Sequence, residues 1–263
     1  MKKKLSRSQI IYLKSLQFFR ISNIEKLKLR LHGYTSTTPI LLDDYKLVYF
    51  PIPKAATQAL KTYFKSLMGI KSASPHSAFF NFIQPVDLVS QPKYHEYFKF
   101  TFVRNPWSRL VSSFETKLPY VDLNVPLYRK AQVPRLNRKY PVMNPNMTFA
   151  EFIEAISATP DPYLDKHLTS QSKYITDDSG NLLVDFIGKV EFFNEDFGKI
   201  VNLANISESI APVPCIRKTK MGSKSLSRLP YRQYYDRHLW NLVGERFKQD
   251  IELLGYEYLK FDP

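Results

Sequence analysis

Two short apolar runs, each followed by a basic residue and a helical pattern, constrain the fold of this chain most. The first run covers residues 46–50, and Lys54 and apolar residues at helical spacing follow it. The second covers residues 98–103, followed by Arg104 and by Pro106, a residue suited to the first turn of a helix. Strands that alternate with helices predict an α/β fold with a central parallel sheet flanked by helices on both faces.

The rest of the chain continues this alternation. Thr148 and Glu151 have the spacing of a capping box at the start of a helix, and residues 182–190 have the composition of another strand. Asn194 is placed to cap the helix that follows. Apolar residues at helical spacing predict a last helix over about residues 231–254.

Composition divides the chain into a lead-in and one domain. We expect a basic lead-in over residues 1–42 and a single domain over residues 43–263, because 44% hydrophobic residues suffice for one core. Residues 118–147 contain five prolines and five basic residues. This composition predicts a basic, irregular insertion, either a solvated loop or one wall of a substrate cleft.

The charge of the chain points to anionic partners. Lys and Arg number 38 against 24 Asp and Glu, so the formal net charge is +14. Nucleic acid, acidic lipid, acidic polysaccharide and phosphorylated small molecules all fit such a surplus. The 19 Phe and 17 Tyr are too many for a disordered chain. Cys215 is the only cysteine, so an internal disulfide is excluded.

The N-terminus is basic and its apolar residues are interrupted. A bilayer span needs about 20 consecutive apolar residues, and no stretch of the sequence approaches that length. Lys14, Gln17 and Arg20 break the apolar pattern, and no small-residue cleavage site follows. We therefore expect no signal peptide, a cytoplasmic location, and at most peripheral membrane contact through the basic N-terminus.

Residues 51–58 (PIPKAATQ) have the pattern of a phosphate-binding connection between a strand and a helix. Small side chains let an anion approach the backbone, and the N–H groups of the first helical turn point toward it. Lys54 adds a mobile positive charge, and Thr57 adds a hydroxyl donor. The chain has no G-x-x-x-x-G-K-[ST] sequence, so this is not a Walker motif. The alternative is an ordinary connection with an exposed lysine.

A second phosphate site is predicted at the end of the other strand. Arg104 ends that strand, and Ser112 lies about two helical turns further along the chain. A guanidinium fork and a hydroxyl together suit a terminal phosphate.

The two segments resemble the 5′- and 3′-phosphate signatures of sulfotransferases that use PAPS (3′-phosphoadenylyl sulfate). The resemblance is to the carbohydrate branch, sulfotransferase family 2, with its chondroitin, dermatan, heparan and uronyl sulfotransferases. Residues 185–191 (DFIGKVE), the spacing His167-x-x-x-Gln171 and residues 250–256 resemble further motifs of this branch. The resemblance covers residues 45–258 and implies a P-loop-NTPase-like sulfotransferase fold.

The resemblance also implies an activity, a nucleotide and binding residues. It implies transfer of a sulfuryl group from PAPS to a carbohydrate hydroxyl, with release of PAP. The residues implied to bind the 5′-phosphosulfate are Lys54, Ala55, Ala56, Thr57 and Gln58. Arg104 and Ser112 are implied to bind the 3′-phosphate, and a basic loop with Arg217, Lys218 and Lys220 to close over the nucleotide. Golgi relatives carry a membrane anchor and paired cysteines, and this sequence shows neither feature. We therefore expect a soluble, bacterial-type member.

Sulfuryl transfer needs a positive charge at the transferred group and a base for the acceptor proton. Lys54 is the candidate for the charge. His76 is the first candidate for the base, because its segment resembles that around the catalytic histidine of the 2-O-sulfotransferases. His167 is the second candidate and Glu115 the third. The histidines show no metal-ligand spacing, so no metal site is expected.

Two other functions are compatible with the charge of the chain. A nucleotide kinase would need a Walker lysine and a carboxylate for Mg²⁺, and the sequence shows neither. A nucleic-acid- or anionic-surface-binding protein without catalysis would use the basic surplus. The sequence has no recognisable reading motif or stacking platform, so no nucleic-acid partner is expected.

Overall fold

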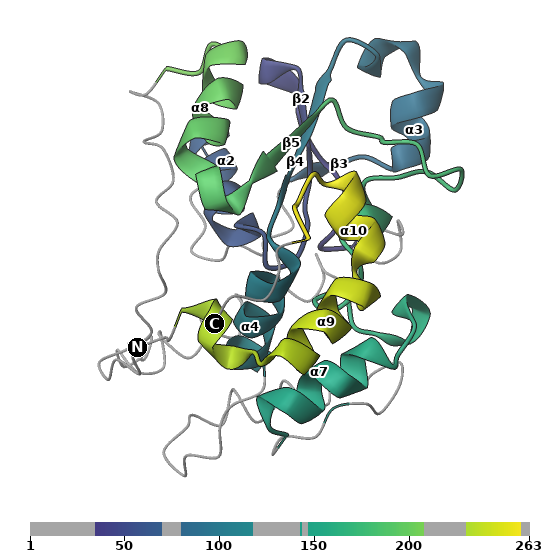
Figure 1. Cartoon of the computed structure of the whole chain (residues 1–263). Coiled ribbons are helices and arrows are strands. Elements are labelled where there is room, and N and C mark those ends of the chain that lie inside the picture. Colours follow the sequence, from purple (N-terminus) through teal and green to yellow (C-terminus); the bar gives the residue numbers. More distant parts are fainter. Residues whose placement is uncertain (1–34, 70–79, 118–142, 144–146, 208–229, 259–263) are drawn as a thin grey trace, which may run out of the picture.

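A five-stranded sheet lies at the centre of the protein (Figure 1). The computed structural model describes residues 35–69, 80–117, 143, 147–207 and 230–258. The strand order is β3-β1-β2-β4-β5. The strands are β1 (Ile40–Leu42), β2 (Leu47–Phe50), β3 (Asn81–Phe82), β4 (Phe98–Val103) and β5 (Phe186–Lys189).

The sheet is parallel where β2, β4 and β5 lie side by side. Tyr49 of β2 lies opposite Phe100 of β4, which in turn lies opposite Phe186 of β5. β1 pairs antiparallel with both β2 and β3, so the prediction of a parallel sheet is wrong at this edge. The turn between β1 and β2 ends at Lys46, with φ of 48°, and is too short for the crossover that parallel strands require. Residues 40–42, at the end of the predicted lead-in, therefore belong to the sheet.

Helices cover both faces of the sheet, as predicted. α2 (Thr57–Leu67) and α8 (Phe193–Leu203) lie on one face, and α3 (Pro85–Ser90) and α10 (Lys248–Leu253) on the other (Figure 1). Successive strand side chains point to opposite faces. Tyr49 and Phe100 accordingly pack with residues of α2 and α8, whereas Val48 and Phe50 pack with residues of α3 and α10.

A second core lies beyond the carboxyl ends of the parallel strands. It is formed by α4 (Pro106–Lys117), α7 (Phe149–Ser157) and α9 (Arg237–Arg246), in the lower half of Figure 1. The buried rings of Trp107 and Trp240 stack with centroids 4.5 Å apart. The Trp107 ring also donates a hydrogen bond to the Trp240 carbonyl at 3.0 Å. This packing fixes α4, which begins at Pro106 as predicted, directly after β4.

Two predicted helix starts have different outcomes. The capping box of Thr148 and Glu151 is confirmed at the start of α7. The prediction that Asn194 caps a helix is wrong, because α8 begins one residue earlier, at Phe193. The Asp196 carboxylate in its first turn instead accepts the N–H of Lys189, which ties the helix to the end of β5.

The predicted last helix is broken into separate pieces. Residues Tyr231–Tyr234 form a 3₁₀ turn, and Asp236 then caps α9 by accepting the N–H of Leu239. Phe247, with φ of −112°, separates α9 from α10. The strand predicted over residues 182–190 is shortened to β5. Within the described ranges, no helix is long and apolar enough to cross a membrane.

Candidate active site

The loop between β2 and α2 has a tight backbone conformation. Lys54 and Ala56 both have positive φ, 73° and 55°, which is uncommon for residues other than glycine. Between them, buried Ala55 donates its N–H to the Ile52 carbonyl at 3.2 Å. The turn delivers the chain directly into α2, whose first-turn N–H groups have no carbonyl one turn earlier to bind. An anion at this helix start would therefore find unused donors.

Thr57 uses its hydroxyl inside this loop. The hydroxyl donates to the Ile52 carbonyl and accepts a hydrogen bond from Tyr49 at 3.4 Å. In this arrangement the residue offers an anion its backbone N–H rather than its hydroxyl proton. Gln58 follows on the exposed side of α2.

The side chain of Arg104 extends along α4. Its Nε donates to the hydroxyl of Ser108 at 2.8 Å. Ser112 lies four residues beyond Ser108 and therefore on the same side of the helix. Both serines are 8% exposed. Arg104 therefore contacts the side of α4 that carries Ser112, through Ser108. Ser108 was not predicted, although its spacing of four residues from both Arg104 and Ser112 could have revealed it.

The side chain of Lys54 reaches the same side of α4. Its ammonium donates to the Thr116 hydroxyl at 2.8 Å, and that hydroxyl donates to the Ser112 carbonyl at 2.8 Å. We call Ser108, Ser112 and Thr116 the hydroxyl stripe. Arg104 contacts one end of the stripe and Lys54 the other, so both predicted phosphate signatures meet on one helix. Cations and hydroxyls are a donor set suited to phosphate and sulfate oxygens.

His167 forms a close pair with Asp165. The ring Nδ1 and the backbone N–H of His167 both hydrogen-bond to Asp165 Oδ1. Burial alone would raise the pKa of Asp165, but these contacts and the nearby Lys166 charge hold it below its ordinary value. With Nδ1–H facing the carboxylate, Nε2 is the nitrogen that can accept a proton. Asp165 was not predicted from the sequence, although its position two residues before His167 could have suggested it.

The His167 segment packs against the same helix as Lys54. Ser113 of α4 donates its hydroxyl to the His167 carbonyl at 3.2 Å. Thr116, the partner of Lys54, lies three residues further along α4, about one helical turn. The candidate base and the candidate lysine therefore approach neighbouring turns of α4.

Arg109 is a buried cation behind these groups. It is 1% exposed, and it donates to the Pro53 carbonyl at 3.1 Å and to the Thr169 carbonyl at 2.8 Å. It forms no ion pair with a carboxylate of the described residues, and its Nη2 lacks a hydrogen-bond partner among them. Burial lowers the pKa of the guanidinium, an effect that Tyr174 and Asp250 oppose. Arg109 joins the Lys54 loop to the His167 segment.

A second group of cations lies beside α2. Lys61 is 4% exposed and donates to the Ser36 carbonyl at 2.9 Å, while Lys166 contacts the Ser36 hydroxyl. Burial, together with the charges of Lys166 and Lys65, lowers the pKa of Lys61 to about 8. Positive charge is thus concentrated near His167.

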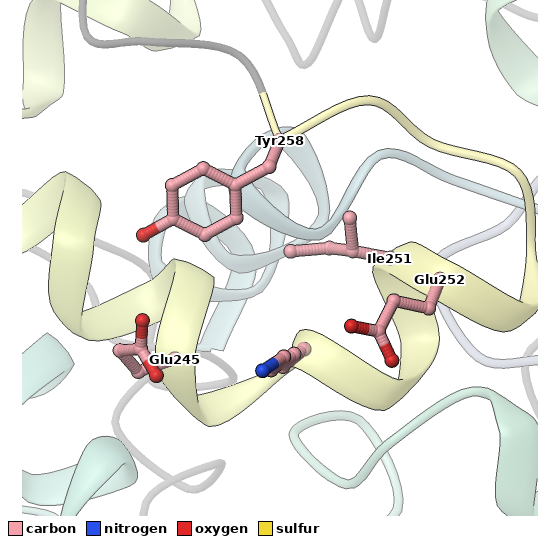
Figure 2. Close-up of a pocket in the computed structure, with 5 residues that line it drawn as sticks. Glu245, Ile251, Glu252 and Tyr258 are labelled. Carbon is pink, nitrogen blue, oxygen red and sulfur yellow. The ribbon is translucent and has the colours of Figure 1, made fainter.

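A cavity beside α9 and α10 lies away from this site. It has a volume of about 310 Å³ and is lined by Glu245, Lys248, Ile251, Glu252 and Tyr258 (Figure 2). Figure 2 shows Glu245 and Glu252 on two successive helices, α9 and α10. Two carboxylates disfavour an anionic ligand there, so the cavity is a poor match to a nucleotide phosphate.

Several predicted site residues lie outside the described residues. They are His76, Arg217, Lys218 and Lys220, together with most of the insertion at 118–147. Glu115, the third base candidate, accepts a hydrogen bond from Tyr234 at 2.9 Å. Within the described part of the chain, no group of three or more His, Cys, Asp or Glu side chains could hold a metal ion.

Comparison with protein families gives a match over most of the chain. A family model described as "Sulfotransferase family" matches residues 39–257, which include every described strand and helix. Neither the curated proteins nor the solved structures contain a match to the chain.

Proposed function

Since the chain belongs to the sulfotransferase family, we propose that it transfers a sulfuryl group from PAPS to a carbohydrate hydroxyl and releases PAP. The observation that carries this proposal is the meeting of Lys54 and Arg104 on one side of α4. Two cations at the ends of neighbouring parallel strands suit a nucleotide with phosphates at both its 5′ and 3′ positions.

The proposed binding residues form two groups, one for each phosphate position of the nucleotide. Lys54 and the N–H groups at the start of α2, including those of Thr57 and Gln58, would bind the 5′-phosphosulfate. Arg104 and Ser112 would bind the 3′-phosphate, and the contact of Ser108 with Arg104 supports its inclusion. The basic loop with Arg217, Lys218 and Lys220 would close over the nucleotide.

The proposed reaction is an in-line displacement at sulfur. The acceptor oxygen forms a bond to sulfur while the bond from sulfur to the 5′-phosphate oxygen breaks. The acceptor proton passes to the base, and PAP leaves with the electron pair of the broken bond. Lys54 would neutralise the charge that builds up on the bridging and sulfuryl oxygens.

Two histidines are proposed for the base. His167 is supported by its pairing with Asp165, which orients the ring and stabilises its protonated form. His76 is supported by its resemblance to the 2-O-sulfotransferase segment. Replacing the true base with alanine is expected to lower turnover by a factor of about 10² while PAP affinity stays nearly constant. Measuring turnover of His167→Ala and His76→Ala side by side decides between them.

The nucleotide proposal is tested by calorimetric titration with PAP and with AMP, which lacks the 3′-phosphate. We expect micromolar or tighter binding of PAP and much weaker binding of AMP. Equal affinity for the two nucleotides would overturn the proposed donor. The carbohydrate acceptor is tested by transfer of labelled sulfuryl from PAPS to a panel of neutral and acidic glycans, with a phenol as comparison. Transfer to the phenol alone would contradict a carbohydrate acceptor.

A further inference from the structure

The backbone of Arg104 is held by a side chain from a distant segment. Gln171 is fully buried. Its Oε1 accepts the N–H of Arg104 at 3.0 Å, and its Nε2 donates to the Arg104 carbonyl at 2.8 Å. One amide thus satisfies both backbone groups of the residue that follows β4. Because the peptide groups on both sides of the Arg104 Cα are bound, the backbone at Arg104 has little rotational freedom.

Gln171 is in turn held by a carboxylate from the C-terminal helix α10. Asp250 is 1% exposed, and its two oxygens accept the N–H of Gln171 at 2.7 Å and that of Ser172 at 2.9 Å. Asp250 therefore fixes the segment from which the Gln171 side chain extends.

The residue after Arg104 is held in the same manner from another direction. Glu191 Oε1 accepts the N–H of Asn105 at 2.8 Å, and Glu191 Oε2 accepts the hydroxyl of Tyr256 at 3.0 Å. Burial and the nearby Glu191 charge raise the pKa of Tyr256, so its phenol keeps the proton that it donates. The Asn105 side chain accepts the N–H of Ser108 at 3.2 Å, which connects this contact to the first turn of α4.

We propose that Gln171, Glu191, Asp250 and Tyr256 are positioning residues, here called the Arg104 brace, that set the selectivity of the site for the 3′-phosphate. They act through the backbone of Arg104 and Asn105. The Arg104 side chain is long, so a small rotation of its backbone displaces the guanidinium by an amount on the order of 1 Å, enough to weaken a bound phosphate. The inference rests on the proposed function, because it assigns the 3′-phosphate to Arg104.

The central test is the ratio of PAP affinity to AMP affinity, with thermal unfolding measured on the same samples. Gln171→Met keeps the volume but removes both contacts with the Arg104 backbone. We expect it to lower the ratio by about ten-fold while AMP affinity stays constant. A folded Gln171→Met protein with the wild-type ratio would overturn the brace. A wild-type protein that does not discriminate PAP from AMP would instead overturn the proposed function.

A milder pair of variants keeps the test decisive if Gln171→Met fails to fold. Tyr256→Phe and Tyr97→Phe each remove one phenol contact with a carboxylate, and both contacts measure 3.0 Å. Tyr97 precedes β4 and lies outside the brace. We expect Tyr256→Phe to lower the PAP-to-AMP ratio by about three-fold and Tyr97→Phe to leave it unchanged. Equal ratios in the two variants would contradict the brace.

Substitution of Glu191 adds a rescue experiment. Glu191→Gln can still accept the Asn105 N–H, and its amide can donate to the Tyr256 oxygen. Glu191→Leu can do neither. We expect Glu191→Gln to keep a PAP-to-AMP ratio close to wild type and Glu191→Leu to lower it by about ten-fold. Equal loss in both variants would show that the charge of Glu191, rather than its hydrogen bonds, sets selectivity, and would overturn this part of the brace.

Discussion

The ends of β2 and β4 lie side by side in the sheet, but they are held in different ways. The loop after β2 is closed on itself by contacts within five residues, since Ala55 and Thr57 both bind the Ile52 carbonyl, and Arg109 adds one contact from outside the loop. The residues after β4 are held by partners 67 and 86 residues away in the chain, Gln171 and Glu191. A loop closed mainly by its own residues suits a lysine that is proposed to neutralise charge as it builds up on different oxygens during the reaction. A strand end held from two directions suits an arginine that recognises a fixed group.

Substitution of Lys54 tests the catalytic side of this comparison. We expect Lys54→Ala to lower turnover by about 10³-fold, because the charge on the departing phosphate oxygen loses its neutralising ammonium. PAP affinity should fall by about ten-fold at most. Steady-state kinetics and calorimetry provide the two measurements. Lys93→Ala removes the same charge from an exposed residue and serves as the control. A larger loss in PAP affinity than in turnover would show that Lys54 acts mainly in nucleotide binding rather than in catalysis.

Substitution of Arg104 should give the opposite pattern. We expect Arg104→Ala to lower PAP affinity by about 10²-fold and to leave AMP affinity almost unchanged, because AMP lacks the phosphate that Arg104 is proposed to bind. Turnover at saturating PAPS should fall by less than PAP affinity does. Arg237→Ala is a control with the same charge change at an exposed position. If AMP and PAP lose affinity equally, Arg104 does not distinguish the two nucleotides.

Arg109 of α4 binds the loop after β2 and the segment that carries His167, so its substitution should loosen both. Lysine in its place cannot donate to the Pro53 and Thr169 carbonyls together, and one buried carbonyl would lose its partner. We expect Arg109→Lys to lower the free energy of unfolding by about 2 kcal/mol. Urea unfolding measures this change. Arg246→Lys is the comparison, because Arg246 is also bound to the Asp161 carboxylate, which a lysine can still reach. Arg109→Lys should lose more unfolding free energy than Arg246→Lys. Equal losses would show that Arg109 has no special role in joining the two segments.

Lys61, in the helix that follows the β2 loop, should give the stability a pH dependence. Its pKa is lowered from 10.5 to about 8 in the folded protein. Between these pH values the unfolded chain binds a proton that the folded protein does not, so stability rises with pH across this window. Below about pH 8 the folded protein carries the full cost of the buried charge.

The pH dependence is measured against Lys61→Met, which has no proton to lose. We expect the stability of the wild type relative to this variant to rise by about 3 kcal/mol between pH 7.5 and 10.5. Urea unfolding at several pH values provides the curves, and Lys93→Met at an exposed position is the control. Parallel curves for wild type and Lys61→Met would show that Lys61 stays protonated in the folded protein.

The same contrast explains what could be predicted from the sequence. β2, β4, the start of α4 and the capping box of α7 depend on neighbouring residues, and all were predicted. The antiparallel β1 was not, because its pairing depends on a turn of four residues, 43–46, whose geometry the apolar pattern does not encode. The apolar residues keep helical spacing on both sides of Phe247. The periodicity of the sequence therefore could not reveal the break between the two helices there.

The predicted site follows the same division. Lys54, Arg104 and Ser112 could be proposed from the sequence because each lies within a short motif, and Ser108 could have been added from its spacing. The burial of Arg109 could not be predicted, because it arises from contacts with Pro53 and Thr169, 56 and 60 residues away. The pairing of Gln171 with the Arg104 backbone is of the same kind. His76 and the basic loop stay predictions.

The position of the Arg104 brace in the chain also bears on biosynthesis. Asp250 and Tyr256 follow all five strands and the helix α4 in the sequence. While the ribosome is still adding these residues, the sheet can form around β2 and β4, because their mutual contacts are already available. The backbone at Arg104 would then still lack the support of α10. A nascent chain is therefore expected to acquire its sheet before it acquires nucleotide selectivity, and a chain released early would fold in part without discriminating between nucleotides.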